Sequence, residues 1–163
     1  MKRLVSLVAL AALLVAPSAF AQFPDEGPDS YGVYFMVDGN YVNSLQGIAP
    51  GFFDAFVVLA GPSAPSIAAW EVALEFDPPQ VTIINPGLTG DAVNYATLPE
   101  FIVGLGTPLV SEEYNVLASM QMFLLAPVEI MVYGGPVGIA TIPGRPAYVN
   151  GEDLTDVRPG YFS

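Results

Sequence analysis

Hydrophobic and polar residues alternate with a period of two along much of the chain, most clearly over residues 67–76. One face of this segment would carry Trp70, Val72, Leu74 and Phe76, and the other Glu71, Ala73 and Glu75. Successive side chains of a strand point to opposite faces, so we predict a strand with the first set in a core and the second set in solvent. The following Asp77-Pro78-Pro79 would end it, since proline cannot donate to a ladder.

Similar short runs of β-branched and aromatic residues recur, separated by clusters of Gly, Pro, Asn and Asp, which is typical of strands joined by turns. The further predicted strands cover residues 31–37, 54–60, 80–84, 101–105, 115–125 and 128–133, with 146–149 as a short edge strand. Asn85-Pro86-Gly87 is predicted to be a turn, and Gly134-Gly135-Pro136 to end a strand. The pattern predicts an all-β fold, a two-sheet antiparallel jelly-roll sandwich of about eight to nine strands.

The segment 115–125 is ambiguous, because its residues include good helix formers and propensity alone would allow a helix. It lacks a clear helical polar face, and it continues through Pro127 into a β-rich run at 128–133. We therefore predict a long strand here.

The N-terminus has the three parts of a secretory signal peptide. Lys2 and Arg3 supply positive charge, residues 4–16 are apolar except for Ser6, and Ala19-Phe20-Ala21 offers small residues for cleavage. A bilayer span takes about 20 apolar residues, so this run is too short for a membrane anchor. We predict a cleaved signal peptide at 1–21, a flexible lead-in at 22–30, and one sandwich domain at 31–163, located in the periplasm or outside the cell.

Cleavage makes the charge more asymmetric. Two of the four basic residues lie in the predicted signal peptide, so Arg145 and Arg158 would face 16 acidic residues in the mature chain, a formal charge of −14. We expect neither nucleic acid nor an anionic membrane surface as a partner, because contacts to phosphate need Lys and Arg. The acidic surface indicates that the mature chain is kept soluble outside the cell by its charge, and the more specific alternative is that the surface binds a cation.

Two parts of the sequence carry a family resemblance. Residues 67–78, an aromatic-containing strand that ends in an Asp-Pro turn, are followed by the Val-rich 81–84 and Pro86-Gly87. Together with the apolar segment 116–123, this arrangement resembles cohesin-type domains, and also the sandwich domains of carbohydrate-binding modules, over about residues 54–133. The resemblance implies a nine-stranded jelly roll with a protein-binding or sugar-binding role.

The sequence limits the available chemistry. It contains no His and no Cys, which excludes Ser–His and Cys–His nucleophilic sites and the usual zinc ligands. No Lys follows the predicted signal peptide, so no Schiff base can form. Glu71 and Glu75 would lie roughly 13 Å apart along one strand, wider than glycosidase geometry, and Glu112-Glu113 is predicted in a loop. We expect all four to be solvated, and we predict that the chain is not an enzyme.

Oxygen-rich clusters offer the remaining candidate for a cofactor, a calcium ion. The residues are Asp38 and Asn40 in one cluster, and Asn150, Glu152 and Asp153 in another. Asp-Gly and Asn-Gly are also ordinary hairpin turns, and we expect turns at both places.

Aromatic residues in loops are candidates for stacking on a ligand such as a sugar. Tyr41, Tyr95 and Tyr114 are predicted in loops beside Asn residues, whereas most other aromatic residues alternate inside strands and are predicted to pack. The sequence thus favours an exported, non-enzymatic module with a structural or protein-interaction role. A carbohydrate-binding module is the alternative, and a glycoside hydrolase that uses carboxylates alone is a weaker one.

Overall fold

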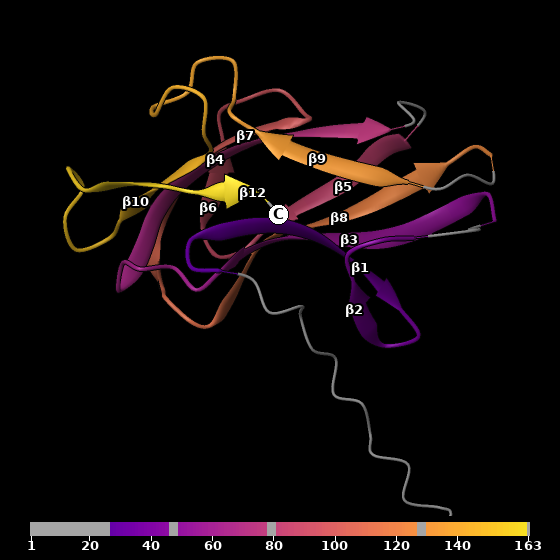
Figure 1. The fold of residues 1–163 in the computed structure, drawn as a ribbon, viewed down its shortest axis with the longest axis horizontal. Helices are drawn as coiled ribbons and strands as arrows, with labels where there is room; N and C mark the ends of the chain where they lie inside the picture. The colour runs from indigo at the N-terminus through magenta and orange to yellow at the C-terminus, as the bar shows by residue number, and fades with distance from the viewer. Residues whose placement is uncertain (1–26, 46–48, 78–80, 127–129, 163) are drawn as a thin grey trace, which may run out of the picture.

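A computed structural model describes residues 27–45, 49–77, 81–126 and 130–162. The predicted signal peptide and most of the predicted lead-in lie outside these residues. Within them the protein is all-β, with twelve strands in two six-stranded sheets and no helix (Figure 1). No helix in this part of the chain is therefore long and apolar enough to cross a membrane.

The strands of the first sheet are β1 (Ser30–Val37), β2 (Asn40–Val42), β3 (Gly51–Ala60), β5 (Val81–Leu88), β8 (Tyr114–Leu124) and β12 (Tyr161–Phe162). Those of the second are β4 (Ser66–Asp77), β6 (Ala92–Asn94), β7 (Glu100–Val110), β9 (Met131–Gly135), β10 (Ala147–Asn150) and β11 (Val157–Pro159). The predicted two-sheet β-sandwich is confirmed, and the larger strand count comes from the short strands β2, β6, β11 and β12.

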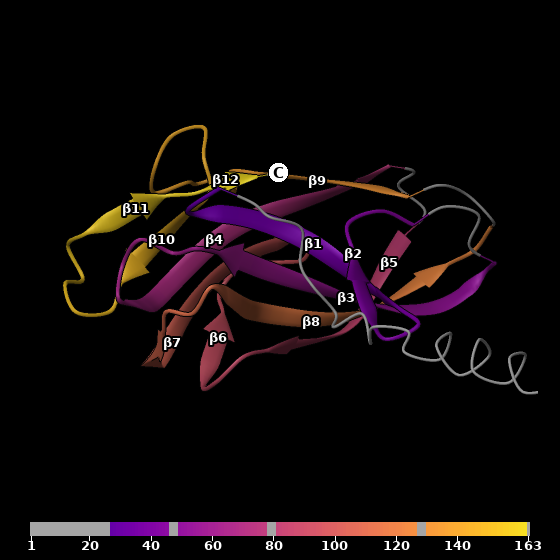
Figure 2. The same ribbon diagram turned by 60° about the horizontal axis from the view of Figure 1, so that its bottom comes forward.

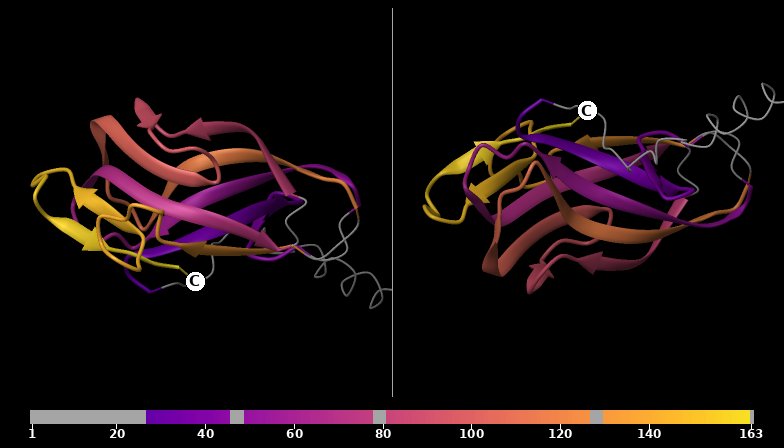
Figure 3. Two further views of the ribbon diagram at one scale, coloured as in Figure 1. Left: turned by 90° about the horizontal axis from the view of Figure 1, so that it is seen from above. Right: turned by 90° about the horizontal axis from the view of Figure 1, so that it is seen from below.

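The first sheet has the order β12-β1-β3-β8-β5, with β2 also on β1, and the second has the order β11-β10-β4-β7-β6, with β9 also on β4. All neighbours pair antiparallel except β1 and β12, which are parallel. The ribbon views show the sheets as two layers: β4 lies in front when the molecule is seen from above, and β3 and β8 when it is seen from below (Figures 2 and 3).

The core lies between the layers and is lined by residues of both sheets. On β4, Trp70, Val72 and Leu74 are buried, as the alternation predicted, and the Trp70 ring stacks on Phe101 of β7 at 5.5 Å between centroids. Met120 on the first sheet belongs to the same hydrophobic cluster. The inward facing of Trp70 is thus confirmed.

Local predictions were right for most strands and wrong at two places. The ambiguous segment forms the long strand β8, as predicted. Asn85-Pro86-Gly87 is no turn: β5 continues through it with a register irregularity and with Asn85 at a φ of 47°. The segment 146–149 was predicted as an edge strand, but β10 lies between β4 and β11. The predicted end of a strand at Gly134-Gly135-Pro136 is confirmed, since β9 ends at Gly135. The beginning of the predicted strand 128–133 lies outside the described residues.

The outer side of β4 corrects a further prediction. Glu71 is on the opposite face from Trp70, as expected, yet it is only 6% exposed. Along one edge of β4, β10 pairs with the part around Glu71, and β9 pairs from Ala73 onward. The connection between them, residues 136–146, hydrogen-bonds to the Glu71 carboxylate, so the side chain is buried rather than solvated.

Candidate functional site

The first calcium candidate is a tight hairpin turn between β1 and β2. Asp38 and Gly39 are its two central residues, with φ of 50° and 79°, and Val37 pairs with Asn40 across it. Positive φ at both central positions is typical of the type I′ turn that joins twisted strands. The Asn40 side-chain amide donates to the Asp38 carbonyl at 3.3 Å. Turn geometry alone therefore accounts for these residues.

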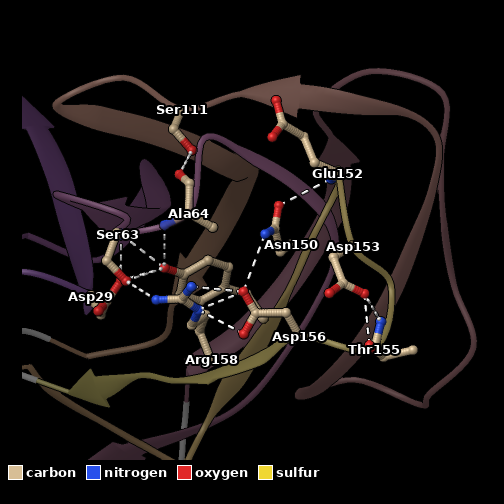
Figure 4. Close-up of polar contacts among 11 residues, drawn as sticks. Asp29, Ser63, Ala64, Ser111, Asn150, Glu152, Asp153, Thr155, Asp156 and Arg158 are labelled. Atoms are coloured by element: carbon tan, nitrogen blue, oxygen red, sulfur yellow. Dashed lines mark hydrogen bonds and ion pairs between the residues drawn. The ribbon is translucent and has the colours of Figure 1, made fainter.

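The second calcium candidate is the loop between β10 and β11 (Figure 4). Asn150 accepts from the Glu152 amide at 3.0 Å and donates to the Asp156 carboxylate at 3.1 Å. Asp153 accepts from the hydroxyl and then from the amide of Thr155, and these two hydrogen bonds lower the Asp153 pKa. The Glu152 carboxylate points away from Asp153 (Figure 4). These oxygens hydrogen-bond within the loop itself, and a bound calcium ion stays an untested alternative.

The acidic side chains of the described ranges do not gather into a metal centre: no group of three or more His, Cys, Asp or Glu there could hold an ion. The two carboxylates of the sequence-predicted pair on β4 lie in different environments: Glu71 is buried under a loop, whereas Glu75 is exposed. Glu112 and Glu113 are exposed before β8.

The three tyrosines predicted in loops lie in different places. Tyr41 is in β2, with its ring edge-on to Phe56 at 5.3 Å, and Tyr114 is the first residue of β8. Tyr95 does lie in a loop, after β6 of the other sheet, and is 76% exposed. The loop assignment was wrong for Tyr41 and Tyr114: β2 begins at Asn40, directly after the two-residue turn, so Tyr41 is its second residue, and β8 begins at Tyr114 itself.

One polar cluster that sequence reasoning missed ties the two ends of the domain together (Figure 4). The Tyr148 hydroxyl donates to Asp29 and accepts from the amides of Ser63, at 2.9 Å, and Ala64, at 3.3 Å. Asp29 also accepts from the Ser63 amide at 2.7 Å. Burial, and then the hydrogen bond to Asp29, raise the pKa of Tyr148. Tyr148 and Asp29 are 119 positions apart in the sequence, and no local sequence pattern indicated this contact.

Both arginines that follow the predicted signal peptide have partners in the C-terminal part of the domain. Arg158 forms an ion pair with Asp156 at 2.7 Å and donates to the Ser63 hydroxyl. Hydrogen bonding to Arg158 is the main cause that lowers the pKa of Asp156. Arg145 donates to the Tyr161 hydroxyl at 3.0 Å, and its guanidinium carbon is 5.0 Å from the centre of that ring.

The connection between β9 and β10, which we call the 136–146 loop, is held by two carboxylates from the sheet below it. Glu71 of β4 accepts from the amide of Thr141 at 2.7 Å and from its hydroxyl at 2.9 Å. Glu100 of β7 accepts from the Gly138 amide at 3.1 Å. Between these two anchored residues, Ile139 is 89% exposed. The loop is thus fixed at its base and presents an apolar side chain at its surface.

A hollow of about 360 Å³ adjoins the start of this loop on the outer face of the second sheet. Its walls include Glu75, Glu100, Tyr133 and Pro136. Glu75 and Tyr133 are directly opposite each other on β4 and β9, and Ala73 is opposite Gly135. A larger hollow of about 470 Å³ lies near the start of β5, and its lining is mainly apolar.

Comparison with known proteins adds no assignment: no protein-family model matches the sequence, and a search of curated proteins found no match. The function is therefore argued from the geometry of this chain.

Proposed function

We propose that this chain is an exported, non-catalytic β-sandwich module that binds a protein partner outside the cytoplasm through its 136–146 loop. The signal-peptide pattern of residues 1–21 supports export, and the lack of His and Cys in the sequence supports a role without catalysis. The resemblance to cohesin-type domains supports a protein partner.

The observation that carries the proposal is the way the loop is built. It is eleven residues long, beyond the common length of two to six residues for connections in compact domains. Two carboxylates of the sheet nevertheless hold it at Gly138 and Thr141. Binding residues are concentrated on loops that a rigid scaffold positions. A loop that is already ordered loses less conformational entropy when a partner binds, so this construction favours recognition.

Ile139 is the residue of this loop that a partner would bury. Its side chain is 89% exposed, the largest exposure among the large hydrophobic residues of the described ranges. Burying a side chain of this size stabilises a complex by about 1.5–3 kcal/mol. A single exposed apolar residue needs no explanation by itself, but here it lies between two anchored positions of one loop.

Affinity capture tests the proposal. The mature chain would be immobilised and exposed to envelope and secreted proteins of its own source cells, in parallel with an Ile139→Asp variant. Leu154→Asp is the matched control, because Leu154 is 69% exposed in the β10–β11 loop. We expect a partner that the wild type and Leu154→Asp retain and Ile139→Asp loses, while all three proteins show the same Trp70 fluorescence. Equal capture by all three would contradict the proposal.

A further inference from the structure

We infer that the hollow beside the 136–146 loop receives a basic side chain, lysine or arginine, of the partner; this inference rests on the proposed function. The hollow is formed where β4, β7 and β9 meet the first residue of the loop, and we call it the β4–β9 hollow.

The shape of the hollow follows from the register of the strands. Its floor includes Ala73 and Gly135, which pair across β4 and β9. A Cβ atom placed on Gly135 would meet nothing within 4 Å, so the space above the floor is open. Glu75 and Tyr133, which pair two residues away along β4 and β9, form one wall. Glu100 of β7, which pairs with Ala73, forms another. The volume of about 360 Å³ is within the range of small ligand sites and is ample for one long side chain.

The carboxylates that line the β4–β9 hollow favour a positively charged ligand. Glu75 is exposed, and no side chain or amide of the described residues donates to its carboxylate. Glu100 uses one oxygen, Oε1, for the Gly138 amide, which leaves Oε2 for a ligand. No arginine or lysine lines the hollow. Both arginines of the mature chain have partners elsewhere, so the chain supplies no cation to this pair.

The Tyr133 ring adds a second feature that favours a cation. It is 48% exposed and lies directly across from Glu75. Side chains of such a pair are about 4.5–5.5 Å apart at Cβ. A lysine or arginine that reaches the Glu75 carboxylate would therefore lie close to the ring, where the attraction of a cation to an aromatic face operates. A neutral sugar could stack on the ring but would leave both carboxylates without a counter-charge.

The charge of the whole domain points in the same direction. With a formal charge of −14 after the predicted cleavage, the domain attracts basic partners over a distance and repels acidic ones. Complementary charge mainly raises association rates and specificity, whereas the apolar contact at Ile139 would supply affinity. The hollow and the loop adjoin at Pro136, so one partner can contact both.

The test uses small probes in place of the unidentified partner. Amide chemical shifts of the mature chain would be followed by NMR during titration with Nα-acetyl-arginine methylamide. The citrulline counterpart, which has nearly the same shape and no charge, is the control probe, and methyl β-glucoside represents carbohydrate. We expect shifts of Ala73, Tyr133 and Gly135 with the arginine probe, with Kd of about 1–10 mM, and none with the other two.

Matched variants separate site binding from general attraction. Glu75→Gln and Glu100→Gln should each weaken the arginine probe about threefold, the size of effect expected for an exposed ion pair. Glutamine keeps an acceptor oxygen for Gly138, so Glu100→Gln preserves the loop. Glu113→Gln removes one charge from an exposed residue before β8 and should leave the Kd unchanged.

Three results would overturn the inference: no shifts at these amides with arginine, equal weakening by Glu113→Gln, or shifts with the glucoside instead. The capture experiment distinguishes the two proposals. Capture that needs Ile139 but is unaffected by Glu75→Gln and Glu100→Gln would overturn the basic-side-chain inference and leave the proposed function in place. Capture that is insensitive to Ile139 would contradict the proposed function, whatever the probes show.

Discussion

The hydrogen bond between Thr141 and Glu71 can be removed with a single isosteric change, Thr141→Val. The Thr141 hydroxyl is 2.9 Å from Oε2 of Glu71, whose side chain is 6% exposed. Valine keeps the volume of threonine but cannot donate, so Oε2 loses a partner while Oε1 retains the Thr141 amide at 2.7 Å. A hydrogen bond to a charged group contributes about 1.5–3 kcal/mol. Because Thr141 itself is exposed, water can partly replace it, and we expect a loss of about 1–2 kcal/mol.

Urea unfolding followed by Trp70 fluorescence measures this loss directly, and thermal unfolding should show a Tm lower by roughly 2–4 °C per kcal/mol in a chain of this size. Thr82→Val is the control, since Thr82 is an exposed residue of β5 with no side-chain hydrogen bond within the described residues. It should change the free energy of unfolding by less than about 0.5 kcal/mol. If Thr141→Val is equally neutral, the Glu71 carboxylate is hydrated and the loop is not held as described.

Three further predictions concern the core and the ionisable groups. Trp70→Ala should cost about 3–5 kcal/mol, because Trp70 is 2% exposed and stacks on Phe101; wild-type fluorescence should move red on unfolding, and a red-shifted folded spectrum would contradict this. Burial raises the pKa of Tyr31 and Tyr148 above 10.0, so above about pH 10 the folded state keeps protons that the unfolded state releases. The free energy of unfolding should therefore be unchanged by these two groups below about pH 10 and fall above it. Urea unfolding at rising pH measures this, and the absence of a fall would contradict the burial of the two hydroxyls. The hydrogen bond from the Thr107 amide is the main cause that lowers the pKa of Asp91 below 3.8. The stability that this contact gives the fold is therefore present above pH 3.8 and is lost as the pH falls through the lowered pKa of Asp91. NMR of the side-chain carboxyl groups should show the lowered titration midpoint of Asp91, and a midpoint at 3.8 or higher would refute the contact.

Period-two alternation was sufficient to predict the sandwich and the facing of β4. It placed Trp70 inward because the alternation is local and the opposite facing would bury Glu71 and Glu75 together. It could not predict that Glu71 is buried on the outer face, since the covering Thr141 comes from 70 residues further along. Alternation reports which face a side chain is on, but not whether another segment covers that face.

The candidate site was beyond sequence reasoning for a related reason. The β4–β9 hollow requires the register that places Tyr133 opposite Glu75, and the pairing of β4 with β9 depends on the whole sheet. The loop tyrosines were predicted from their neighbouring Asn residues, but Asn40, Asn94 and Asn115 are all strand residues. An adjacent Asn therefore did not distinguish Tyr95, which lies in a loop, from Tyr41 and Tyr114, which lie in strands. The Asp-Gly turn at residue 38 was predictable, because its conformation is set by adjacent residues alone.

The most direct test of partner recognition through the 136–146 loop is site-specific photocrosslinking in the source cells. A photoreactive phenylalanine derivative would replace Ile139 in one version of the chain and Leu154 in another, both positions being highly exposed. Recognition through the loop predicts a discrete protein adduct after illumination from position 139 and none from position 154. No adduct from position 139, or the same adducts from both positions, would contradict it.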